Sequence, residues 1–268
     1  MEVIALLKIF MPFIIGACIG SFLCCQVCRL RLRELHKKPL GSRSVCMYCH
    51  YRLKWYDNLP IISWLALGGK CRRCHHKIGL AELLSELGTG LALAAISTTI
   101  DWTTVTPLTW ANFIIILLFT FTLIFLAIYD GLYGELPTIC LIVAIVFAVI
   151  ALVLKELALL SATYFTPELI WRPLLSVVIL GGIYLVLYLV SHGKWVGDGD
   201  WLLGTAIALV LYDPWLSLIA LFLANFIACL VMYPAIKSRK NHHIHFGPFL
   251  VIAFVITYTF TNFFLTML

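Results

Sequence analysis

The chain has 268 residues, of which 62% are hydrophobic and only 12% are charged, and its formal net charge is +6. A soluble domain carries roughly a quarter of its residues as charges, and long apolar runs recur here, which together exclude an ordinary soluble protein. We therefore expect an all-α membrane protein with about eight transmembrane helices. The predicted spans are 3–24, 80–100, 110–129, 137–154, 173–191, 201–212, 214–236 and 249–268.

Basic residues gather in two places. Twelve of the nineteen Lys and Arg residues lie between Arg29 and Lys77, and a smaller basic group lies at 237–240. Because basic loops stay on the cytoplasmic side of a membrane, both groups predict membrane orientation and not a nucleic-acid-binding patch. Alternation of the predicted spans puts both groups in the cytoplasm and both chain termini outside.

The loop after the first span contains two paired cysteine motifs. Cys46-x2-Cys49 and Cys71-x2-Cys74 are separated by 21 residues, slightly more than the common range, and such a pair of motifs predicts a tetrahedral zinc site. Cytoplasmic thiols stay reduced, which favours a metal over a disulfide. Four cysteine ligands leave no open position for water, so we expect a structural zinc. A redox pair or metal-free thiols are the alternatives.

Two acids stand beside apolar runs. Asp130 ends the run "FLAIYD", and Asp200 follows the glycines of "GDGD". The predicted topology places both at cytoplasmic ends of spans, where a carboxylate is a functional candidate. Two carboxyl groups held close together share a proton and titrate as a unit, an arrangement that suits hydrolysis of an amide bond. The glycines allow the backbone to bend and a substrate to approach.

Other roles for these acids stay open at this point. Asp130 is also suited to cap the turn that follows it, and Asp198 or Asp200 to cap the helix predicted at 201–212. Acids at membrane depth also couple proton or cation movement in transporters.

Several segments together resemble one known family over nearly the full chain. In chain order they are "GSFLCCQVCRL", "RSVCMYCHYRLKWYDNLPIISWLALGGKCRRC", "ELGTG", "DGLYGELP", "GDGDWLLG" and "HFGPFL". Their order and spacing are similar to those of the type IV prepilin peptidases, also called leader peptidases. One departure is Cys24, which stands where the family has Asn.

The resemblance implies catalytic roles for Asp130 and Asp200, and none for Asp198, which falls on a variable position. It implies zinc ligation by Cys46, Cys49, Cys71 and Cys74. It also implies an aspartic endopeptidase of the bacterial cytoplasmic (inner) membrane, with its active site facing the cytoplasm. Such enzymes remove the basic leader from pilin-like precursors of pilus, secretion or competence systems. We expect two regions, 1–100 with the zinc loop and 101–268 as a six-span peptidase domain.

Many members of that family also methylate the new N-terminal amine with S-adenosylmethionine. This activity is associated with the N-terminal loop, including a glycine two residues before the third loop cysteine, which is Gly69 here. The sequence has no glycine-rich dinucleotide-binding fingerprint that would locate the methyl donor independently. The basic loop is expected to contact anionic lipid headgroups.

Two alternative functions remain from the sequence. Signal-peptide-peptidase-like proteases also use Tyr-Asp and GxGD motifs, and Tyr129-Asp130 satisfies the first, but they lack the four-cysteine loop. A proton-coupled transporter with an accessory zinc loop belongs to a different class, and the paired broken helices that would support it are not apparent.

Overall fold

The computed structural model describes residues 2–35, 44–100, 106–162, 167–193, 196–237 and 245–267. Arg43, Trp195 and the basic residues at 37–38 and 238–240, which entered the sequence analysis, lie outside these ranges. Within the described residues every secondary-structure element is a helix, and two isolated β-bridges are also present. The chain divides into two compact units, Met1–Thr98 and Thr99–Leu268.

The all-α membrane fold is confirmed, although not every predicted span has full membrane length. Among the described residues, six helical segments are long and apolar enough to cross a bilayer: Leu7–Glu34, Leu80–Ser97, Pro107–Tyr133, Thr138–Leu160, Glu168–Ser191 and Pro214–Tyr233. The helices α10 (Gly247–Thr259) and α11 (Thr261–Met267) form a seventh if they count as one span, and they meet at a bend of 72°.

The segment predicted as the span 201–212 forms a shorter helix. This helix, α8 (Asp200–Leu211), has 12 residues and is therefore about 18 Å long, whereas a bilayer core is about 30 Å thick. Most of its side chains are buried, with Leu203, Ile207 and Leu211 almost completely so. The helix is thus enclosed by neighbouring helices along most of its surface.

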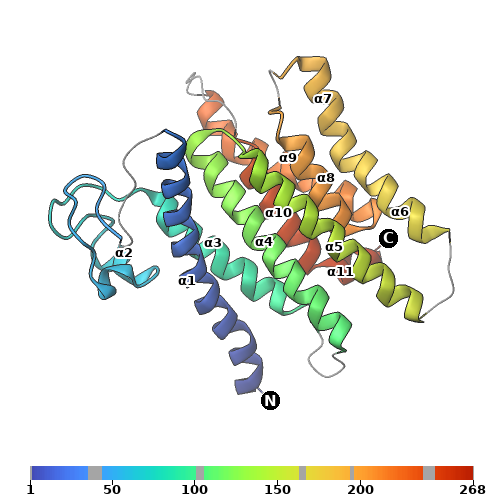
Figure 1. Cartoon of the computed structure of the whole chain (residues 1–268), viewed down its shortest axis with the longest axis horizontal. Coiled ribbons are helices and arrows are strands. Elements are labelled where there is room, and N and C mark those ends of the chain that lie inside the picture. Colours follow the sequence, from blue (N-terminus) through green and yellow to red (C-terminus); the bar gives the residue numbers. More distant parts are fainter. Residues whose placement is uncertain are drawn as a thin grey trace. The chain divides into compact units, whose positions relative to one another are not determined.

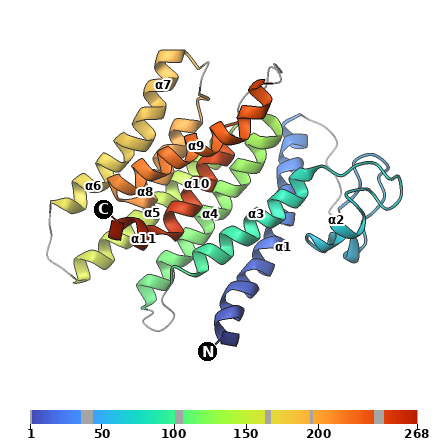
Figure 2. The same ribbon diagram turned by 180° about the vertical axis from the view of Figure 1, so that it is seen from behind.

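The first unit is built on two long helices, α1 (Glu2–Glu34) and α3 (Leu80–Ser97), which pack along each other (Figures 1 and 2). A Cβ atom on Gly16 would lie 2.9 Å from the Gly90 backbone, so the contact requires small residues. Between these helices the chain forms a cysteine-rich loop with two short helices, η1 (Trp55–Asn58) and α2 (Ile62–Ala66).

The second unit surrounds α8. The helices that follow the unit boundary are α4 (Pro107–Tyr133), α5 (Thr138–Ala162), α6 (Glu168–Val177), α7 (Ile183–Ser191) and α9 (Pro214–Lys237). The π-helical turn η2 (Val178–Gly182) joins α6 to α7 within one continuous span. The helix α8 packs against α5, α6 and η2, while α10 lies against α4 and α9 (Figures 1 and 2).

Candidate functional site

Asp130 lies in the last turn of α4 and is 6% exposed. Its Oδ2 atom accepts a hydrogen bond from the Gly247 N–H at 2.9 Å, and Gly247 is the first residue of α10. The carboxylate therefore faces the positive end of another helix, where an anion is stabilised. A Cβ atom at position 247 would lie 2.8 Å from that same oxygen, so the contact depends on glycine.

Asp200 is the first residue of α8 and is also 6% exposed. Its Oδ2 atom accepts a hydrogen bond from the Gly197 N–H at 3.0 Å. The neighbouring Gly199 is buried against Leu136, whose side chain would lie 2.7 Å from a Cβ atom at position 199. The two glycines on either side of Asp198 thus have different roles: Gly197 donates a hydrogen bond to Asp200, and Gly199 allows Leu136 to pack closely.

The fold brings the two buried acids near each other. The Leu136 side chain packs on Gly199, so the chain just after Asp130 contacts the residue before Asp200, and the charges of Asp130 and of the exposed Asp198 act electrostatically on Asp200. On the other side, His245 Nδ1 lies 3.8 Å from Asp130 Oδ1. Each buried acid also accepts a backbone N–H near a helix N-terminus, so capping and a chemical role are compatible here. Two adjacent carboxyl groups in a poorly solvated site are able to exchange a proton with a bound water and to hydrogen-bond a carbonyl.

The sequence analysis assigned no role to the segment that completes this site. The motif "HFGPFL" contributed to the family resemblance, yet its contacts with Asp130, through His245 and Gly247, were not predicted. These residues are more than a hundred positions from Asp130 in the chain, and no local pattern links them. The only available signal was a glycine-proline pair at the start of an apolar run, which indicates a helix N-terminus.

The four predicted zinc ligands lie together in the first unit. Their Sγ atoms all lie within 4.8 Å of one another, with Cys46 and Cys74 3.9 Å apart and Cys49 and Cys71 4.0 Å apart. A zinc–sulfur distance of about 2.3 Å gives tetrahedral sulfur–sulfur distances of about 3.8 Å, so the cluster fits this metal.

The two cysteine motifs adopt the same local structure. His50 N–H donates to the Cys46 carbonyl and His75 N–H to the Cys71 carbonyl, and both histidines have a positive φ of 53°. Each turn is closed by a β-bridge, Val45 with Arg52 in the first motif and Lys70 with Lys77 in the second. Two matching turns whose cysteine sulfurs point toward one another are typical of a zinc site with four cysteine ligands.

Backbone N–H groups favour the thiolate form at one of the four cysteines, Cys71. Hydrogen bonds from the backbone of Cys74 and Arg73 lower the pKa of the Cys71 thiol to about 7. Among the described residues the cluster contains cysteines alone, and the ring of His76 instead packs on Tyr48.

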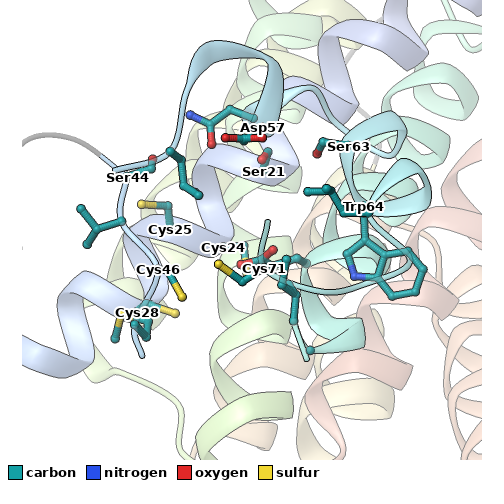
Figure 3. Close-up of a pocket in the computed structure, with 18 of the residues that line it drawn as sticks. Ser21, Cys24, Cys25, Cys28, Ser44, Cys46, Asp57, Ser63, Trp64 and Cys71 are labelled. Atoms are coloured by element: carbon teal, nitrogen blue, oxygen red, sulfur yellow. The ribbon is translucent and has the colours of Figure 1, made fainter. Parts of the chain in front are cut away.

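The first unit also contains a cavity of about 430 Å³ beside the cysteine cluster (Figure 3). Its lining residues include Cys24, Cys25 and Cys28 from α1 and Trp64 from α2 (Figure 3). The cavity therefore adjoins the position where this chain has Cys24 and the family has Asn.

Three carboxylates line this cavity, and two of them are engaged by the loop. Asp57 pairs with Arg72 at 2.7 Å, which raises the pKa of that guanidinium, and Glu86 accepts the Ile61 N–H at 2.6 Å. Glu82, from the first turn of α3, is exposed to solvent at the cavity wall. The Glu82 carboxylate is thus available to a ligand in the cavity.

Gly69, the predicted methyl-transfer residue, contacts a cavity wall without being part of it. It has a positive φ of 64°, and a Cβ atom there would lie 2.7 Å from Cζ2 of Trp64. Trp64 lines the cavity, and its Nε1 atom is buried with no hydrogen-bond partner among the described residues (Figure 3). The absence of a side chain at position 69 therefore allows the indole to occupy its place.

Comparisons with known proteins identify chains with similar sequences. Residues 14–100 match the family model of the bacterial peptidase A24 N-terminal domain. A prepilin leader peptidase/N-methyltransferase of Myxococcus xanthus is 41% identical over 91 residues, which cover 34% of this chain and 26% of that relative. Proteins of the same name match over greater lengths in two other organisms. The relative from Stutzerimonas stutzeri is 25% identical, with 90% of this chain and 86% of the relative covered. The relative from Dichelobacter nodosus is 28% identical, with 82% and 72% covered. No solved structure matches the chain.

Proposed function

We propose that this chain cleaves the leader of type IV prepilin-like precursors, with Asp130 and Asp200 as its catalytic pair. The premise is membership of the type IV prepilin peptidase family, which the family match and the named relatives support. The observation that supports the proposal most directly is the burial of both acids in one unit, beside the contact between Leu136 and Gly199. Isolated buried carboxylates are costly, and a pair at membrane depth is a functional candidate.

The chemistry follows from two neighbouring carboxyl groups. Mutual repulsion keeps one of them protonated, so the pair holds one proton. The ionised acid accepts a proton from a water whose oxygen attacks the scissile carbonyl carbon. The protonated acid donates a hydrogen bond, and then its proton, to the carbonyl oxygen. Collapse of the tetrahedral intermediate breaks the carbon–nitrogen bond. The leaving nitrogen takes up the proton of one acid, and a hydroxyl of the intermediate gives its proton to the other acid as the new carboxyl group forms, so the pair again holds one proton.

The orientation of the site is inferred from charge. The basic residues between Arg29 and Lys77 favour a cytoplasmic loop, and alternation of the spans gives the Asp130 end of α4 the same side. A precursor with one apolar segment and a basic leader would then present the junction between them at the acid pair. The basic loop itself suits contact with anionic lipids.

The test is mass spectrometry of a prepilin precursor co-expressed with the protein and its variants. Asp130→Asn and Asp200→Asn each remove an ionisable acid, so we expect cleavage to fall by about a thousandfold or more. Asp198→Asn is the matched control, because this neighbouring acid is exposed, and its variant is expected to retain cleavage. Normal cleavage by both buried-acid variants, or solute flux without proteolysis, would contradict the proposal.

A second activity, methylation of the new N-terminus, is supported by the cavity of the first unit. S-adenosylmethionine carries a positive sulfonium, an adenine ring and an activated methyl group that it supplies to an amine. Glu82 lines the cavity and is suited to hold the sulfonium. The same mass spectrum reports this activity, as the mass of one methyl group on the cleaved product.

A further inference from the structure

Tyr184 is a buried aromatic residue that the sequence analysis did not single out. It lies at the start of α7, directly after the π-helical turn η2, and is 1% exposed. Its ring packs on Phe246 with a centroid distance of 5.3 Å, and its Cδ2 would lie 3.3 Å from a Cβ atom on Gly204. The side chain is therefore held between the start of α10 and one face of α8.

Both neighbours of Tyr184 lead to the acid pair. Gly204 lies four residues after Asp200, one turn along the same face of α8. Phe246 immediately precedes Gly247, whose N–H binds Asp130. In agreement with this placement, Tyr184 interacts electrostatically with Asp200. The phenol ring thus lies beside the contacts that hold each acid.

The oxygen of the Tyr184 hydroxyl accepts a hydrogen bond, but its proton is not donated to any residue that the structure describes. Asn225 Nδ2 donates to the Tyr184 hydroxyl oxygen at 3.2 Å and to the Leu221 carbonyl at 2.8 Å. Among the residues that the structure describes, no acceptor is found for the Tyr184 O–H proton. A buried hydroxyl without an acceptor is unfavourable, so this proton is suited to a partner that arrives with the substrate.

We propose that the Tyr184 hydroxyl donates a hydrogen bond to the scissile carbonyl oxygen as that oxygen gains negative charge. The inference rests on the proposed peptidase function and adds a third group to its two acids. A donor fixed before the reaction stabilises the developing oxyanion at no cost in reorganisation. Asn225 fixes the hydroxyl oxygen, and the glycines at 181 and 204 let η2 and α7 approach α8 closely enough to place the ring.

The π-helical turn helps to set the direction of Tyr184 toward α8 and Phe246. A π turn inserts an extra residue and rotates the positions that follow by about 100° relative to an uninterrupted α-helix. Tyr184 is the second residue after the turn, so its direction depends on η2. π turns of this kind are frequent at functional sites.

The experiment is steady-state cleavage of a purified precursor by full-length variants. Tyr184→Phe keeps the ring and removes the donor, so kcat is expected to fall by about tenfold to a hundredfold while KM changes by less than about twofold. Tyr188→Phe is the matched control, because Tyr188 lies one turn later on α7 with its ring against Gly193, and it is expected to keep the original kcat. Asn225→Ala is expected to lower kcat as well, and to add little to Tyr184→Phe.

An unchanged kcat in Tyr184→Phe would overturn the proposal. So would a loss that is additive with Asn225→Ala, or a loss matched by a lower melting temperature, since either result indicates packing alone. Asp200→Asn in the same assay separates the two hypotheses. If it abolishes cleavage while Tyr184→Phe does not slow it, the tyrosine proposal fails and the acid pair stands.

Discussion

Two adjacent glycines in the turn after α2 differ in what surrounds them. Gly68 and Gly69 have positive φ values of 58° and 64°, a region that other residues rarely adopt. A Cβ atom on Gly68 would meet open space, whereas one on Gly69 would overlap the Trp64 ring. Substitutions at the two positions therefore distinguish the effect of backbone strain from the effect of displacing Trp64, which lines the cavity.

We predict that Gly69→Ala lowers methyl transfer at least tenfold, because a Cβ atom 2.7 Å from the indole must displace Trp64. Leader cleavage is expected to stay within about twofold of the original rate, since Gly69 belongs to the other unit from the acids. The measurement is the methylated fraction of cleaved precursor by mass spectrometry.

Gly68→Ala is the control for Gly69→Ala. It carries a similar strain of about 1–2 kcal/mol from its left-handed backbone, without the overlap with Trp64. If Gly68→Ala loses as much methylation as Gly69→Ala, then backbone strain and not the indole position is responsible.

The cysteine loop is the segment that we expect to depend most on a bound metal. Apart from its two bridges and short helices, it contains little regular structure, and its turns converge on the four sulfurs. Structural zinc sites of this kind contribute on the order of 10 kcal/mol to folding, which exceeds what a loop of this size gains from packing.

Removal of one ligand is therefore expected to unfold the loop locally. For Cys74→Ser we predict a zinc content well below one ion per chain and faster limited proteolysis between residues 44 and 79, as measured by elemental analysis and peptide mapping. Cys229→Ser is the matched control, because this exposed thiol lies on α9, and its variant should bind zinc normally. Equal zinc content in both variants would argue against the four-cysteine site.

The elements also indicate what a sequence reveals and what it does not. The apolar runs predicted the long helices, and the spacing of the cysteines predicted the cluster, because both patterns are local. The break near Phe260 within the predicted span 249–268 and the π turn η2 were missed, since hydropathy reports how apolar a segment is and not its path.

The candidate site was predictable in its acids and not in their surroundings. Asp130 and Asp200 stand out as carboxylates beside apolar runs, whereas the contacts of Gly247 with Asp130 and of Tyr184 with Phe246 are created only by the fold. A glycine N–H and a buried tyrosine leave no distinctive local pattern in a chain with 17 glycines and 11 tyrosines.

Across the whole molecule, the two candidate sites belong to separate units. The cavity and the cysteine cluster are formed by residues of Met1–Thr98, and the acid pair by residues of Thr99–Leu268. All residues that line the cavity or form the cysteine cluster belong to the first unit, and all residues that contact the two acids belong to the second. The two proposed reactions are therefore expected to be separable by substitution.

We predict that Glu82→Gln loses about tenfold or more of methyl transfer while it cleaves precursor normally, because removal of the carboxylate weakens the hold on a cationic donor. Asp200→Asn is expected to show the reverse, with no cleavage of precursor and retained methylation of a synthetic peptide that already has the mature N-terminus. Both are measured by mass spectrometry on the same purified protein. Loss of both reactions in either variant would indicate that the units do not work independently.

The hydrogen bond from Gly247 to Asp130 also has a consequence for biosynthesis. The acid is translated in α4, but its backbone donor comes 117 residues later, at the start of α10. A ribosome-bound chain that has inserted only its earlier helices holds both aspartates without this donor. The acid centre of this protein is thus complete only late in synthesis, once α10 has been made.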